Sequence, residues 1–165
     1  MDRVIEKLIE LLTASVVTPR GIKAIYNGRV KQIPAASFPA IIIKGVNFIS
    51  ETLDTHRNQE IYSLQILLAH DERNFVGQDQ TKTTTERAVR KIFEERVDGT
   101  NEYKDDTILA VVLKEFLCTS TFNLSVEVDD LDFGPDLDDL FDVDSPGFYG
   151  RLDITVRATP VRVKV

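Results

Sequence analysis

Two segments near the C-terminus show the clearest pattern in the chain, an alternation of apolar and polar residues. Between 116 and 128 the even positions are mostly apolar and the odd positions mostly polar, and a similar alternation returns between 148 and 158. A period of two with one apolar face is typical of antiparallel strands that bury one side. The two segments therefore predict a long C-terminal hairpin.

The connection within this hairpin is strongly acidic. Nine acidic residues and no lysine or arginine lie between 127 and 144, while the whole chain carries a net charge of -7. The rest of the chain is therefore close to neutral, which argues against sequence-independent DNA binding, since that depends on clustered lysine and arginine. We expect residues 129–147 to form an acidic loop at the tip of the hairpin. Its aspartates are Asp129, Asp130, Asp132, Asp136, Asp138, Asp139, Asp142 and Asp144.

The remaining periodicities predict two helices and four further strands. Apolar residues recur at helical spacing at 3–15, where Thr18–Gly21 ends the helix, and at 83–97, where Gly99 ends it. Apolar runs predict strands at 22–26, 38–49, 60–69 and 108–113. Asn27-Gly28 predicts the turn of a short hairpin, and residues 50–59 a polar connection.

These elements predict a single α+β domain over residues 1–165. Its sheet is expected to be mixed but mostly antiparallel, packed against two helices, and completed by the acidic-tipped hairpin. Residues 159–165 alternate apolar and basic side chains after a proline. Two interpretations of this segment stay open: an extended C-terminal arm that adds a strand to a neighbouring sheet edge, or a frayed terminus.

Composition narrows the class of protein. A length of 165 residues suits one domain, and no apolar run approaches the roughly 20 residues of a membrane span. The first residues are charged and lack the apolar centre of a signal peptide, so we expect synthesis in the cytosol. Cys118 is the only cysteine, which excludes an intrachain disulfide and favours a small buried thiol.

The sequence gives no positive signal for catalysis or for a cofactor. Asp130-x-Asp132-x-Gly134 lacks the later ligands of an EF-hand, so a docked acidic loop is favoured over a calcium site. Pro135-Asp136 opens like a nuclease motif, but the following strand lacks the acidic-x-Lys triplet. His56 and His70 have no second ligand at metal spacing, and neither a Gly-x-Ser-x-Gly elbow nor a phosphate loop is present. We therefore predict no catalytic, cofactor-binding or metal residues and no enzyme.

The order of the expected elements resembles that of a known class of proteins. An amphipathic N-terminal helix precedes a short hairpin and a strand entered through Phe38-Pro39-Ala40-Ile41. A paired strand at 60–68 follows, then the helix at 83–97 and the closing segment Arg151–Val156. In this order and length the chain resembles the tail terminator (tail completion) proteins of long-tailed bacteriophages. The acidic loop is longer than a minimal member would need.

The resemblance implies a mechanical role in the virion tail and neck, for a protein made in the host cytoplasm. Such proteins form a ring of identical copies, usually a hexamer, on the head-proximal end of the tail tube. The implied partners are the tube protein, a head-tail connector or neck protein, and in contractile tails the sheath. DNA would only pass through, and no membrane is involved. The alternatives are a head-completion or neck adaptor ring and a small cytosolic protein-binding module.

The acidic loop has two functional interpretations within that role. Facing the lumen of a ring, its carboxylates would let DNA pass without adhering, because like charges repel. Facing outward, they would dock a basic partner and steer its association. A solvated loop that only improves solubility is the third interpretation.

Overall fold

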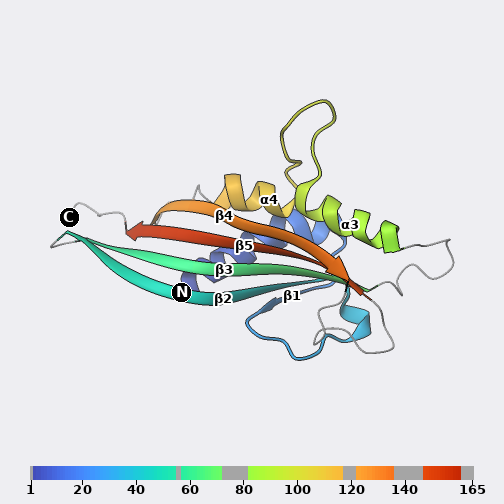
Figure 1. The fold of residues 1–165 in the computed structure, drawn as a ribbon, viewed down its shortest axis with the longest axis horizontal. Helices are drawn as coiled ribbons and strands as arrows, with labels where there is room; N and C mark the ends of the chain where they lie inside the picture. Colours follow the sequence, from blue (N-terminus) through green and yellow to red (C-terminus); the bar gives the residue numbers. More distant parts are fainter. Residues whose placement is uncertain (1, 55–56, 72–81, 117–121, 136–146, 161–165) are drawn as a thin grey trace.

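The computed structural model describes residues 2–54, 57–71, 82–116, 122–135 and 147–160. They form one five-stranded sheet in the order β1-β2-β3-β5-β4, with helices stacked on one of its sides (Figure 1). β1 runs parallel to β2, and the other neighbouring strands are antiparallel. The predicted α+β class with a mixed, mostly antiparallel sheet is therefore confirmed.

The N-terminal helix is longer than the predicted 3–15. α1 (Asp2–Leu12) continues through a π-helical turn (Thr13–Val17) into α2 (Thr18–Arg20). The chain leaves the helix at Gly21, whose φ of 66° is a left-handed conformation that glycine adopts without steric cost. The extra turns are stabilised by tertiary burial, since Val16 is completely buried in the core.

The short hairpin expected at Asn27-Gly28 is wrong. β1 (Ala24–Asn27) pairs in parallel with the start of β2 (Ala40–Asp54), so a crossover joins the two strands instead of a tight turn. The crossover includes a 3₁₀ turn at Ala35–Ser37. Ile33 and Phe38 from this segment pack against β2 and β3 on the side of the sheet opposite the helices. This small second cluster holds the crossover in place.

The polar connection expected at 50–59 is also wrong. β2 extends to Asp54 and β3 (Arg57–Asp71) begins three residues later, so both strands run through the polar stretch. Irregularities between Gly45 and Asn47 and between Thr52 and Asp54 interrupt the strict alternation of sides along β2. The stretch is polar because this half of β2 lies at an exposed edge outside the core.

A helical segment stands where a strand was expected at 108–113. α4 (Ile108–Ala110) continues into a π-helical turn (Val111–Glu115), and residues 108 to 112 are all buried. An apolar run that is buried all round has no periodicity to distinguish helix from strand. Thr107 starts the helix, because its side-chain oxygen accepts a hydrogen bond from the Ala110 amide at 3.2 Å.

The predicted helix at 83–97 is present as α3 (Lys82–Glu94) but ends earlier. Gly99, with φ of 74°, does not cap it. It lies in the following turn, where Arg96 and Tyr103 form an isolated bridge.

The C-terminal hairpin is confirmed in its pairing and corrected in its boundaries. β4 (Phe122–Pro135) pairs antiparallel with β5 (Gly147–Pro160) along its whole length. Phe116 therefore belongs to the end of the helical segment, and the first strand continues beyond 128. The connection at 136–146 lies outside the described residues, as do Cys118 and the segment 161–165.

The main core lies between the helices and one side of the sheet. Alternate residues of β3 and β5 point into it, among them Tyr62, Leu64, Leu152 and Ile154. Helices α1 and α3 and the segment from Ile108 to Phe116 supply the other half of the core. Within the described residues, no helix is both long and apolar enough to cross a membrane.

Candidate interaction surfaces

The side of the sheet that faces away from the helices carries a cross-strand ladder of charges. Arg151 on β5 lies 3.3 Å from an Asp130 carboxylate oxygen and 3.2 Å from one of Asp153. Arg157, further along β5, lies 3.1 Å from a Glu127 oxygen. These contacts are diagonal across the two strands or lie along β5, and exposed ion pairs of this kind stabilise a sheet modestly. We call this surface the open face of the sheet.

The predicted acidic residues divide into two groups. Asp129, Asp130 and Asp132 are residues of β4 and do not belong to the connecting loop, which corrects their expected place. Each has a polar partner on β5: Thr155 donates to Asp129 at 2.8 Å, and Arg151 lies near both Asp130 and Asp132. The remaining five lie outside the described residues. These are Asp136, Asp138, Asp139, Asp142 and Asp144.

Part of the predicted acidic charge is therefore offset within the hairpin. The linear sequence from 127 to 144 contains no cation, but β5 brings two arginines alongside the acidic strand. Sequence reasoning missed this because the pairing depends on the register of the two strands. The alternation at 148–158, with Arg151 and Arg157 on its polar positions, was the available signal.

The outer part of β2 is a second surface, which the sequence did not single out. β1 covers the edge of β2 only from Ala40 to Ile43. From Lys44 to Thr52 no described strand lies on that side of β2. Apolar side chains on this stretch are unusually exposed: Val46 by 66%, Phe48 by 44% and Ile49 by 47%.

This exposure follows from the position of β2 in the two layers. The core covers β3 and β5 as far as Tyr62 and Ala158, whereas every residue of β2 from Gly45 to Leu53 is exposed. In Figure 1, β2 and β3 extend past the helices toward the left of the view. Long, apolar, unpaired edges are the parts of a sheet that accept strands from other chains.

β4 is the opposite edge of the same sheet. Its side chains on the helix side, Leu124, Val126 and Leu131, are half-buried against the core, and Val128 is exposed. On the open face it presents Ser125, Glu127 and Asp130. The two edges of the sheet thus differ in sequence and charge: β4 separates apolar from polar residues between its two sides, whereas β2 exposes Phe48 on the helix side and Ile49 on the open face.

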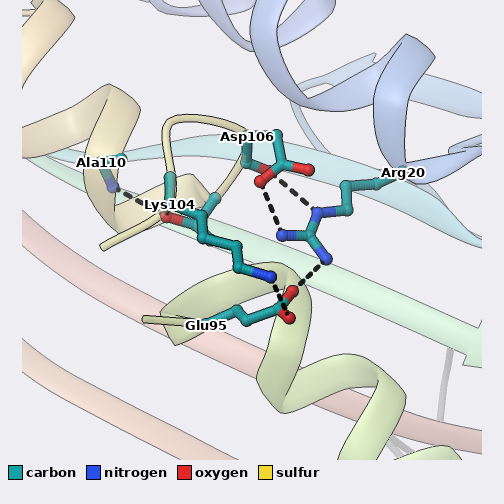
Figure 2. A network of polar contacts seen from close by, with 6 residues as sticks. Arg20, Glu95, Lys104, Asp106 and Ala110 are labelled. Carbon is teal, nitrogen blue, oxygen red and sulfur yellow. Dashed lines mark hydrogen bonds and ion pairs between the residues drawn. The ribbon is translucent and has the colours of Figure 1, made fainter. Parts of the chain in front are cut away.

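A partly buried polar network fixes the helical layer behind these strands (Figure 2). Arg20, at the end of α2, lies 2.5 Å from a Glu95 oxygen and 2.7 Å from Asp106 Oδ1. Its Nε also donates to the Asp106 carbonyl at 3.2 Å, and Lys104 Nζ lies 2.7 Å from the other Glu95 oxygen. These contacts join three segments that are distant in sequence.

The network also shifts the ionisation of its members. Hydrogen bonds from Lys104 and then from Arg20 lower the pKa of Glu95 from 4.5 to about 2. The same contact with Glu95 raises the pKa of Lys104. Both pKa shifts favour the charged forms of Glu95 and Lys104, so these residues form a structural ion-pair cluster.

Of the two histidines, the structure describes only His70. His70 is buried at the end of β3, and burial lowers the pKa of its imidazole. His56 lies outside the described residues. In the part of the chain that the structure describes, no three His, Cys, Asp or Glu side chains gather as metal ligands. Comparison with models of protein families and with curated proteins gives no match.

Proposed function

We propose that the protein is a structural virion component that caps the head-proximal end of a phage tail tube as a ring. The ring would end polymerisation of the tube and form the surface that joins the head connector or neck protein. The observation that carries this proposal is the pair of open, dissimilar edges on one sheet. The resemblance of the sequence to tail terminator proteins supplies the class of assembly and its usual sixfold symmetry.

Two dissimilar edges are what a closed ring of identical subunits needs. Around a rotation axis every interface joins two different patches of the same chain, so the chain must carry both. The outer edge of β2 carries exposed apolar residues among polar ones, with Lys44 at its start, whereas the edge of β4 carries acidic residues. A subunit that uses both edges within its ring presents neither of them to a further subunit, so the ring is closed.

The lengths of the strands also support an assembly role. β2 to β5 contain 14 or 15 residues each. At about 3.3 Å per residue a strand of this length spans roughly 45 Å, compared with about 20 Å for a common strand. The apolar residues on the exposed half of β2 would gain burial through contacts with a neighbouring copy.

Deletion of the gene from the phage or prophage that carries it tests the proposal. We expect overlong tubes, or headless tails with an uncapped end, when tail lengths are measured by electron microscopy. Expression of the wild-type gene from a plasmid should restore tails of normal length. Complete virions with tails of normal length in the deletion strain would overturn the proposal. Tails of normal length that lack heads would instead favour the neck adaptor.

A further inference from the structure

The structure points to a specific interface for the proposed ring. We propose that the outer edge of β2 in one copy pairs antiparallel with the outer edge of β4 in the next copy. The sheet then continues from subunit to subunit. This inference rests on the proposed function, because it takes self-association into a ring as given and assigns the surfaces that meet.

The existing pairing of the sheet shows which residues would face one another. Residues across the sheet form rows, and one row joins Lys44, Gln65, Asp153 and Asp130. Another joins Phe48, Tyr62, Val156 and Val126. The free stretch of β2 therefore occupies the same rows as the first two-thirds of β4.

A second copy placed beside the first without a shift along the strands would continue these rows. Since β4 runs antiparallel to β2 within the sheet, the new pair would also be antiparallel. A rotation axis parallel to the strands leaves every copy at the same position along that axis. The strands of neighbouring copies would therefore pair without a shift in register. Lys44 then faces Asp130 of the next copy, and Phe48 faces its Val126.

Lys44 and Phe48 gain neighbours of matching chemistry in this arrangement. On the open face, Lys44 meets a strand whose carboxylates remain well exposed despite their arginine partners, Glu127 by 62% and Asp130 by 59%. No carboxylate of the described residues lies within ion-pairing distance of Lys44 itself. On the helix side, the ring of Phe48 lies 5.2 Å from that of Tyr62 between centroids, and in the proposed pair it would gain Val126 and Val128 of the next copy as neighbours.

β1 limits the extent of this pairing. It already lies beside β2 from Ala40 to Ile43, so the neighbouring β4 can pair only from Lys44 outward.

Cysteine cross-linking tests the two edges directly. Asn47 and Glu127 share a row, so we would make Asn47→Cys and Glu127→Cys separately, each with Cys118→Ser to remove the only native thiol. Mixed and mildly oxidised, the two variants should form disulfide-linked dimers. Each variant alone should not. The double variant should give a ladder of linked multimers.

Two results of that experiment would overturn the inference. Strong cross-linking of Asn47→Cys alone would mean that β2 edges pair with each other around a twofold axis. No cross-linking in the mixture would also overturn it. Neither result bears on capping itself, which is judged separately by tail length after gene deletion. Virions of normal length from the deletion strain would refute capping even if the edges cross-link as expected.

Charge exchange provides a second measurement that does not depend on engineered thiols. Lys44→Glu should weaken self-association at least about tenfold in sedimentation velocity, because like charges would face one another. Adding Asp130→Lys to it should recover most of the loss. Lys91→Glu, the same charge change on the exposed surface of α3, is the matched control. Association unaffected by Lys44→Glu, or no recovery in the double variant, would overturn the edge assignment.

Discussion

At Gly150 a side chain of the helical layer packs directly against the backbone of the sheet. A Cβ atom added there would lie 2.4 Å from Cε2 and 2.9 Å from Cδ2 of Phe93, and 3.1 Å from Cε1 of Phe133. Carbon atoms in contact normally stay about 3.5–4.0 Å apart. The Phe93 ring would therefore have to move by about 1 Å or more to admit a single methyl group. This makes Gly150→Ala a sensitive probe of the way α3 packs on β5.

The ring has little room to move. Phe93 is completely buried, and the Phe133 ring meets it edge-on with 5.7 Å between centroids. Arg90 in turn lies over Phe133, with its guanidinium carbon 4.2 Å from the ring centroid. Inserting a carbon into a well-packed core costs about 1–3 kcal/mol. Because the neighbours on both sides are fixed, we expect Gly150→Ala to lower the free energy of unfolding by about 2–3 kcal/mol.

Urea unfolding at low protein concentration, followed by circular dichroism, measures this loss without a contribution from self-association. For a chain of this size the loss corresponds to a decrease in Tm of roughly 5–10 °C. Gly134→Ala is the matched control, because its Cβ would lie 3.2–3.3 Å from Tyr149 ring atoms and should cost less than about 1 kcal/mol.

A compensating change makes the test specific. Phe93→Leu shortens the obstructing side chain, so it should cost less in the Gly150→Ala background than in the wild-type protein. The coupling between contacting residues is expected to be about 1 kcal/mol or more. If Gly150→Ala unfolds within about 0.5 kcal/mol of the wild type, or if the two changes are additive, the packing of α3 against Gly150 is wrong.

Three further predictions concern the polar network and the acidic loop. Arg20→Ala should lower the free energy of unfolding by about 1–2 kcal/mol in urea, because it leaves Asp106 without its charged donor and Glu95 with Lys104 alone. The control Arg87→Ala, on the exposed side of α3, should change little. Since the pKa of Glu95 falls from 4.5 to about 2 on folding, its contribution is complete above pH 4.5 and is lost as pH falls toward 2. Glu95→Gln should weaken the dependence of the free energy of unfolding on pH in this acidic range. If that dependence is the same in the variant and the wild type, the lowered pKa of Glu95 is contradicted. Four aspartates of the loop should be changed to asparagine together in the phage: Asp136, Asp138, Asp139 and Asp142. Normal particles that eject DNA poorly would favour a lumen-facing loop, failure of tails to join heads would favour docking, and normal infectivity would exclude both.

The sequence predicted elements best where one side of the element is buried and the other is not. The alternation in β3 and β5 is nearly unbroken, and both strands appear within a few residues of their expected places. The stripes of α1 and α3 were recognisable for the same reason. In each case a single hydrophobic surface imposes its own period on the sequence.

The errors come from places where that condition fails. Residues 108–112 are buried on every side, so their composition suggested a strand although Thr107 caps a helix. The outer half of β2 is exposed on both sides, so its polar residues suggested a loop. The parallel pairing of β1 depends on contacts with β2 that are set by the crossover through Ile33 and Phe38, and no local signal predicts it.

The candidate surfaces follow the same logic in reverse. Apolar residues that lie outside the subunit's own core can be buried by a neighbouring molecule. β2 has a half that is buried in its own subunit and a half that is exposed. From Ala40 to Ile43 it is completely buried, whereas beyond Gly45 its apolar residues remain exposed together with an unpaired edge. Natural edges of this kind are usually shortened or protected by charge. Here only Lys44 and Glu51 flank a stretch of exposed apolar residues on both sides of the sheet. In the proposed ring this outer half of β2 would be buried against the edge of β4 of the next copy, with Lys44 and Phe48 in the rows of Asp130 and Val126.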